Sequence, residues 1–125
     1  MLLRPTRIYV KAIQAALAAG RIHSLCHVTG GGLPENLPRV LPAGIALELD
    51  RASWTVPPIF SVIQRLGGVS DAEMFRTFNM GLGLVLTVPE SDADAVSKAF
   101  EAAGERVQRV GRAVAHTDGE RVILR

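Results

Sequence analysis

The fold of this chain is decided by the stretch Cys26-His27-Val28-Thr29-Gly30-Gly31-Gly32-Leu33-Pro34-Glu35-Asn36-Leu37-Pro38-Arg39-Val40-Leu41-Pro42. Residues 24–29 are predicted to form a short buried strand, because Leu25 and Val28 are apolar. Three consecutive glycines follow, and then a helical turn opened by a proline. Glycine runs lose backbone entropy on folding, so they normally mark positive φ angles or the close approach of another group.

The glycine run Gly30, Gly31 and Gly32 has two interpretations. A strand, a glycine turn and a helix start point several backbone N–H groups into one concavity, which suits a phosphate group. The alternative is a tight strand-to-helix turn that binds no ligand. The pattern matches neither the P-loop nor the dinucleotide fingerprint, so the residues alone leave both interpretations open.

Several polar side chains lie next to this turn. Adjacent residues of a strand point to opposite faces, which argues against a nucleophilic pair of Cys26 and His27, and Cys26 is predicted to be a small core residue. His27 then shares a face with Thr29, beside the predicted anion site. A histidine at such a position is most often a structural hydrogen-bond donor. Asn36 either orients a substrate or ties down the loop through neighbouring backbone groups.

Helices and strands alternate along the rest of the chain, which predicts an α/β (α+β) fold with helices packed on a mixed sheet. A helix capped by Thr6 is expected to run to about Ala19, followed later by a strand at Ile45–Leu49. The last two strands are expected to form a hairpin with Asp118-Gly119 at its tip. The other expected elements are two helices, a continuous apolar strand, a helix and those two strands, at 57–66, 71–78, 84–88, 89–103, 106–115 and 120–124.

Three further features have a functional and a structural interpretation. Arg7 either reaches an anion in a neighbouring cleft or is solvated. Gly81 and Gly83 alternate, which leaves one strand face bare for either a packed helix or a ligand. Asp92 and Asp94 resemble a metal pair, but acidic residues in a first helical turn usually interact with the helix dipole, so no metal site is predicted.

Composition narrows the classes of function. The 125 residues, 48% hydrophobic and 21% charged, predict one globular domain. A net charge of +2, without a basic run, argues against nucleic acid. The single cysteine fits a reducing cytoplasm, and no apolar run is long enough for a membrane span. We expect a soluble cytoplasmic domain in which residues 1–5 are the remnant of a linker.

Three more segments belong with the glycine motif, in the same chain order: Pro5–Lys11, Trp54–Phe60 and Glu73–Gly83. Together with His27–Pro42 they resemble the C-terminal domain of the AIR synthetases, the phosphoribosylformylglycinamidine cyclo-ligases of purine biosynthesis. The resemblance covers nearly the whole chain. Enzymes of that family are much longer, and their N-terminal half, which carries most of the ATP site, has no counterpart here.

The resemblance implies a three-layer α/β domain, distantly ferredoxin-like, that belongs to an ATP-dependent ligase. In that reaction the γ-phosphoryl group of ATP, with Mg²⁺, activates the amide oxygen of formylglycinamidine ribonucleotide. An internal nitrogen then attacks, and phosphate leaves to give aminoimidazole ribonucleotide. The resemblance also implies catalytic roles for His27 and Asn79, and substrate or phosphate contacts by Thr29, Gly30, Gly31, Gly32, Asn36, Gly81 and Arg7.

The isolated domain is expected to be an inactive half of an active site, completed by the missing N-terminal domain, and to bind neither ATP nor Mg²⁺ tightly by itself. Its uncovered apolar surface is expected to include Ile8, Leu33 or Met80, and a homodimer is left open. The alternatives are formylglycinamidine ribonucleotide synthase, selenophosphate synthetase, or a stand-alone phosphate-binding or regulatory module. The long motif His27–Pro42 favours the cyclo-ligase.

Overall fold

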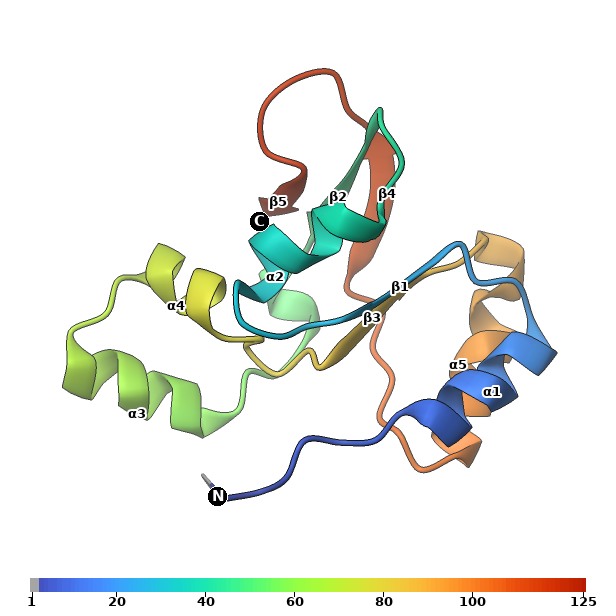
Figure 1. The fold of residues 1–125 in the computed structure, drawn as a ribbon, viewed down its shortest axis with the longest axis horizontal. Coiled ribbons are helices and arrows are strands. Elements are labelled where there is room, and N and C mark those ends of the chain that lie inside the picture. The colour runs from blue at the N-terminus through green and yellow to red at the C-terminus, as the bar shows by residue number, and fades with distance from the viewer. Residues whose placement is uncertain (1–2) are drawn as a thin grey trace.

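The computed structural model describes residues 3–125, and within them helices and strands alternate as the sequence predicts (Figure 1). The α/β class is therefore confirmed. The helices are α1 (Val10–Ala19), α2 (Gly32–Asn36), α3 (Pro58–Gly67), α4 (Asp71–Thr77) and α5 (Ala93–Ala102). The strands are β1 (Ser24–His27), β2 (Ile45–Leu49), β3 (Leu84–Thr87), β4 (Gly111–Ala115) and β5 (Val122–Leu124).

The strands form two sheets rather than the one mixed sheet expected. β1 pairs with β3 in antiparallel register, and β2 lies between β4, which is antiparallel to it, and β5, which is parallel to it. Residues 106–110, predicted as strand, precede β4 and lie outside both sheets. Arg109 in this segment is ion-paired with Glu90 and Asp94 near the start of α5, which holds it away from a ladder.

The predicted C-terminal hairpin is wrong, because β4 and β5 lie on opposite sides of β2. The reason is a set of distant hydrogen bonds made by Arg121 just before β5. Its guanidinium donates to the carbonyl oxygens of Pro38, Leu41, Pro42 and Ile45, which fixes the approach to β5 at the far edge of β2. The turn at Asp118-Gly119 therefore belongs to a connection that crosses β2, and it does not close a hairpin.

The ends of the helices follow local signals in most cases. Ser70 Oγ accepts the Glu73 N–H (3.3 Å) and starts α4 as predicted, and Gly68 ends α3 with a φ of 60°. The first helix differs, because α1 begins at Val10 and not directly after Thr6. Tyr9 occupies the position before the helix, and Arg7 is ion-paired with the distant Glu105, so tertiary contacts hold these residues outside it.

Two hydrophobic clusters lie on either side of β3. Val85 belongs to a large cluster with residues of β1, β2 and α4, whereas Leu84 and Leu86 pack against a smaller cluster formed by α1 and α5. Trp54 is buried in the large cluster, as its predicted packing role requires, and its indole Nε1–H donates to the Met80 carbonyl at 3.1 Å. β3 therefore lies between the two hydrophobic clusters and contributes side chains to both (Figure 1).

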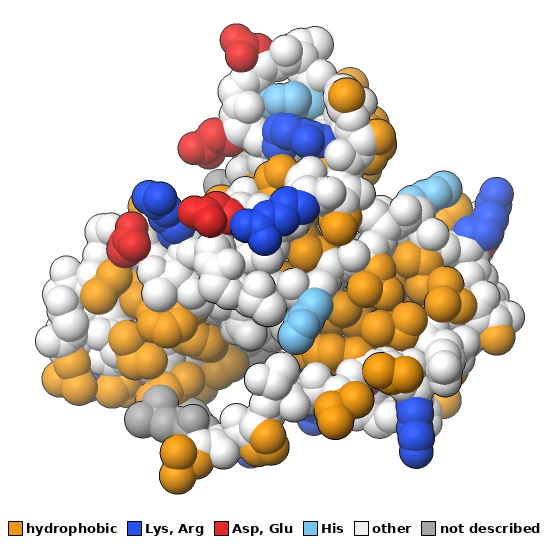
Figure 2. Space-filling view, in the orientation of Figure 1, with side chains coloured by type: hydrophobic (Ala, Val, Ile, Leu, Met, Phe, Trp, Pro, Cys, Tyr) orange, Lys and Arg blue, Asp and Glu red, His pale blue; other side chains and the backbone are white. Residues whose placement is uncertain are grey.

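Apolar side chains remain exposed on α1 and directly before it. Ile8 is 85% exposed, and Val10 and Leu17 are each more than half exposed. Figure 2 shows hydrophobic surface gathered over this part of the molecule. The expected contribution of Leu33 and Met80 to such a surface is wrong, because both are buried in the large cluster. Among residues 3–125, the helices are too short or too polar to cross a membrane.

Candidate functional site

Two polar side chains predicted for the site, His27 at the end of β1 and Thr29 two residues after it, lie on one face of the extended segment. Cys26 and Val28 are buried, whereas His27 and Thr29 are exposed on the opposite face, as strand alternation predicts. Burial raises the pKa of the Cys26 thiol, so this cysteine is protonated at neutral pH. The core role of Cys26 is confirmed, and His27 and Thr29 lie together beside the glycine loop.

Gly32 is required by the packing of the loop. Its φ is 60°, and a Cβ added there would lie 1.8 Å from the carbonyl oxygen of Phe75 and 2.9 Å from that of Phe78. Only a residue without a side chain allows the backbone of α2 to approach the C-terminal end of α4 this closely. At this position, the interpretation as a tight turn accounts for the glycine without a ligand.

The buried side chain of Asn36 holds the glycine loop in place through hydrogen bonds. Its side chain is 4% exposed, and Nδ2 donates to the carbonyl oxygens of Thr29 (3.2 Å), Gly30 (3.1 Å) and Gly32 (2.9 Å). Its Oδ1 accepts the Thr29 hydroxyl at 3.4 Å. Of the two roles considered for Asn36, these contacts match the one in which it ties down the loop.

Gly30 and Gly31 differ in what surrounds them. Gly31 has a φ of 98°, and an added Cβ would lie 2.7 Å from Glu35 Oε2. The Glu35 carboxylate is paired with Arg76 at 3.1 Å, so its charge is balanced. Gly30 is exposed, and an added Cβ would meet no atom within 4 Å. The side of the loop at Gly30 is therefore the side open to a ligand.

Residues 79–82 form a tight turn next to this loop. Met80 and Gly81 have positive φ angles of 51° and 100°, and Leu82 N–H donates to the Asn79 carbonyl, as in a type I′ turn. Asn79 Oδ1 also accepts the Gly81 N–H at 2.9 Å. Of the two interpretations of the alternating glycines, these contacts match packing, because Pro57 lies against the Cβ position of Gly81 and Tyr9 against that of Gly83.

The glycine loop and the turn at Asn79 leave the two-stranded sheet at the same end. His27 lies opposite Leu84 in the register, and the Val28 N–H donates to the Gly83 carbonyl at 2.9 Å, one step further along. The next residues along the two paired segments are Thr29 and Leu82. The ladder therefore brings the predicted residues of the loop and of the turn to one edge of the molecule.

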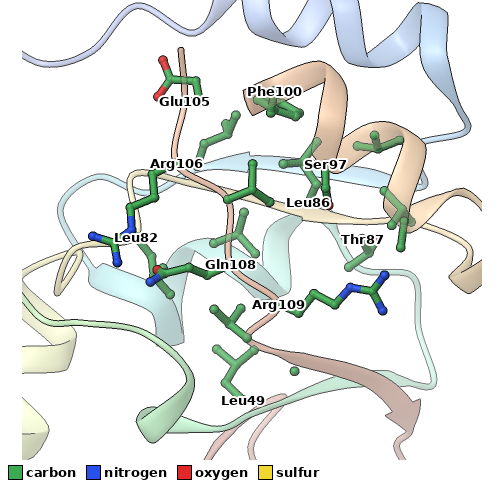
Figure 3. A pocket seen from close by; sticks show the side chains of 18 of the residues that line it. Leu49, Leu82, Leu86, Thr87, Ser97, Phe100, Glu105, Arg106, Gln108 and Arg109 are labelled. Carbon is green, nitrogen blue, oxygen red and sulfur yellow. The ribbon is translucent and has the colours of Figure 1, made fainter. Parts of the chain in front are cut away.

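A cavity of about 600 Å³ lies on the other side of β3, between that strand, α5 and residues 105–113 (Figure 3). Leu82, Leu86 and Phe100 form its apolar lining, and Glu105, Gln108 and Arg109 lie on the segment along one wall. Of the predicted site residues, only Arg7 and Gly81 line this cavity. Arg7 is ion-paired there with Glu105.

The acidic residues dismissed as a metal pair have other partners. Asp92 Oδ2 accepts the backbone N–H of Arg21 at 2.8 Å, and Asp94 is paired with Arg109. Throughout the described residues 3–125, no three His, Cys, Asp or Glu side chains are grouped so as to hold a metal ion.

Sequence reasoning missed one contributor to this region, Tyr9. The rings of Tyr9 and His27 lie edge-to-face, with their centroids 5.9 Å apart. The available signal was that Pro5–Lys11 and Glu73–Gly83 both belong to the segments that carry the family resemblance.

Comparisons with known proteins agree on one family. The family described as AIR synthase related protein, C-terminal domain, matches residues 1–123. A phosphoribosylformylglycinamidine cyclo-ligase of Bordetella petrii is 49% identical over 122 residues, covering 96% of this chain and 35% of that enzyme. The cyclo-ligase of Desulfitobacterium hafniense is 45% identical and that of Bacillus velezensis 49%, over 94% and 89% of this chain. The chain spans 35% and 32% of their respective lengths.

Proposed function

This chain belongs to the family of AIR synthase related proteins, C-terminal domain, and on that premise we propose that it is the C-terminal part of a phosphoribosylformylglycinamidine cyclo-ligase. The whole enzyme would use ATP to close the imidazole ring of aminoimidazole ribonucleotide from formylglycinamidine ribonucleotide. The matched relatives are about three times longer than this chain, so the domain would contribute one side of an active-site cleft. The remainder of the enzyme would supply the other side.

The observation that carries this proposal is the edge where His27, Thr29 and Gly30 are exposed together. The backbone of the loop is fastened by Asn36 and by the close approach of Gly32 to α4, so its geometry is fixed before a ligand arrives. Preorganised backbone donors stabilise an anion without the cost of rearrangement. An anionic phosphate of the ribonucleotide, or the phosphate released, fits the open side at Gly30.

His27 and Asn79 are the proposed catalytic side chains. An exposed imidazole beside the loop is able to hold or move a proton during ring closure, in which the attacking nitrogen loses a proton. The side-chain Oδ1 of Asn79 accepts the Gly81 N–H, and no acceptor among residues 3–125 takes a hydrogen bond from Asn79 Nδ2. That amide group is therefore the part of Asn79 that would contact the substrate.

ATP and Mg²⁺ are implied by the family but do not fit this chain by itself. Magnesium in nucleotide sites is held by carboxylates together with phosphate oxygens. The acidic residues near the proposed site are engaged elsewhere, since Glu35 is paired with Arg76. We therefore assign no step through the metal or the nucleotide to these residues and place those ligands on the remainder of the enzyme.

Activity of a full-length cyclo-ligase that carries this chain as its C-terminal part tests the proposal. Gly30→Val should reduce ring closure by at least about a hundredfold, because its side chain enters only the space left for the ligand. His27→Ala should cause a comparable loss in kcat. Ala43→Val, in an exposed loop, is the matched control and should leave the rate unchanged. Near-normal activity of both Gly30→Val and His27→Ala would refute the assignment of this site.

A further inference from the structure

Tyr9 is in contact with the proposed catalytic histidine although it belongs to a different part of the fold. Its ring and that of His27 are 5.9 Å apart between centroids and inclined by 68°, which is an edge-to-face arrangement. Tyr9 directly precedes α1, whereas His27 ends β1. The contact therefore links the half of the molecule built on α1 and α5 to the edge that carries the glycine loop.

Gly83 provides the space in which the tyrosine lies. A Cβ added at Gly83 would lie 2.2 Å from the phenolic oxygen of Tyr9 and 3.3 Å from the ring carbon that bears it. Gly83 does not have a positive φ, so backbone conformation is not what requires a glycine there. The same residue accepts the Val28 N–H, one position from His27. The tyrosine ring is thus confined between His27 and a position that only glycine leaves open.

The surroundings of Tyr9 keep its phenol neutral and its backbone fixed. Burial raises the pKa of Tyr9, and the charge of Glu105 raises it further. Two residues earlier, Arg7 is ion-paired with the same Glu105, which ties the segment before α1 to the segment after α5. A neutral aromatic ring held at both ends is able to restrict the rotation of a neighbouring imidazole.

We propose that Tyr9, seated against Gly83, is a positioning residue that sets the orientation of the His27 imidazole in the active site. This inference rests on the proposed function, which gives His27 its role. Tyr9 acts through the histidine and makes no contact with the reacting atoms. The aromatic ring, not the hydroxyl, is the part that does this, so phenylalanine should replace tyrosine and an aliphatic side chain should not.

The first test measures the ring protons of His27 in this chain by NMR. Tyr9→Leu should remove the ring-current shift on those protons, whereas Tyr9→Phe should retain it. Gly83→Ala should displace the phenol and alter the His27 signals, and adding Tyr9→Phe to Gly83→Ala should restore them in part, because the clashing oxygen is gone. Gly67→Ala at the end of α3 is the control glycine and should change nothing at His27.

The second test measures kinetics in a full-length cyclo-ligase that carries the same substitutions. Tyr9→Leu should lower kcat by about two- to tenfold with little change in KM, and Tyr9→Phe should restore kcat. Unchanged His27 signals in Tyr9→Leu, or an unchanged kcat where His27→Ala abolishes activity, would overturn the positioning role. If His27→Ala itself leaves activity intact while the NMR contact persists, the proposed function of His27 fails, and with it a role for Tyr9 in this reaction.

Discussion

Two regions border the two-stranded sheet of β1 and β3: the glycine loop at its end, and the flank, which is the side of β3 that faces the cavity and residues 105–113. The two regions differ in how tightly they are packed. In the loop, Asn36 donates to three carbonyl groups and Gly32 touches the end of α4, so little space or freedom remains. On the flank, no described strand other than β1 pairs with β3, and a cavity of about 600 Å³ lies between β3, α5 and residues 105–113. The difference indicates that rigidity is concentrated where His27 and Thr29 are presented.

The most damaging single change to the rigid side should be Gly32→Ala. The new Cβ would overlap the Phe75 carbonyl oxygen, and the alanine would have to adopt a φ of 60°. Strain and overlap together should cost about 3–5 kcal/mol of unfolding free energy. Urea unfolding followed by circular dichroism measures this loss. Gly30→Ala is the control, and equal stability of the two variants would show that the loop is not tightly packed on α4.

Asn36→Ala should be the next most severe change. It removes the hydrogen-bond donor of three loop carbonyls in a buried position, which should cost about 2–3 kcal/mol. It should also broaden the amide signals of the loop, because the Gly30 carbonyl loses the Asn36 donor and the Thr29 carbonyl keeps the Gly32 N–H alone of its two donors. A loss below about 0.5 kcal/mol in urea unfolding would mean that water or a neighbouring group replaces the amide.

On the flank, the prediction concerns the backbone amides of β3, which alternate between a paired and an unpaired side. The bond from Val28 to Gly83 shows that Gly83, Val85 and Thr87 direct their backbone groups toward β1, so those of Leu84 and Leu86 point the other way. Hydrogen exchange should therefore be roughly tenfold or more faster at the Leu84 and Leu86 amides than at Val85. Equal protection along the strand would show that residues 106–110 or another group pair with that edge in solution.

Local sequence signals predicted the ends of several elements, and the features that the sequence did not predict depend on long-range contacts. The ends of α3 and α4 depend on Gly68 and Ser70, which act within a few residues. The position of β5 depends on Arg121 and carbonyl groups about 80 residues earlier, which no local pattern reveals. Strand alternation is a local signal, and it placed His27 and Thr29 on one exposed face. The contact of Tyr9 with His27 and Gly83 joins residues far apart in the chain, which no local pattern predicts.

A smaller effect is expected at the start of α5. The backbone N–H of Arg21, and then the hydroxyl of Ser91, hold the pKa of Asp92 below its ordinary value. A carboxylate with a lowered pKa stabilises the folded state above the unfolded pKa, and this contribution is lost as the pH falls through the folded one. Asp92→Asn should therefore be slightly less stable than the parent at pH 7, with the difference fading below about pH 4. A difference independent of pH would contradict this.

Phosphate titration of this chain, followed by backbone amide shifts, tests most directly the claim that the rigid edge binds an anion. The amides of Thr29, Gly30 and Gly31 should shift together and saturate, with an affinity that falls as salt is added. Gly30→Val should abolish these shifts while the amides of α3 and α4 keep their positions. Shifts that cluster around the cavity instead, or binding by Gly30→Val equal to that of the parent, would show that the glycine run serves only as a turn.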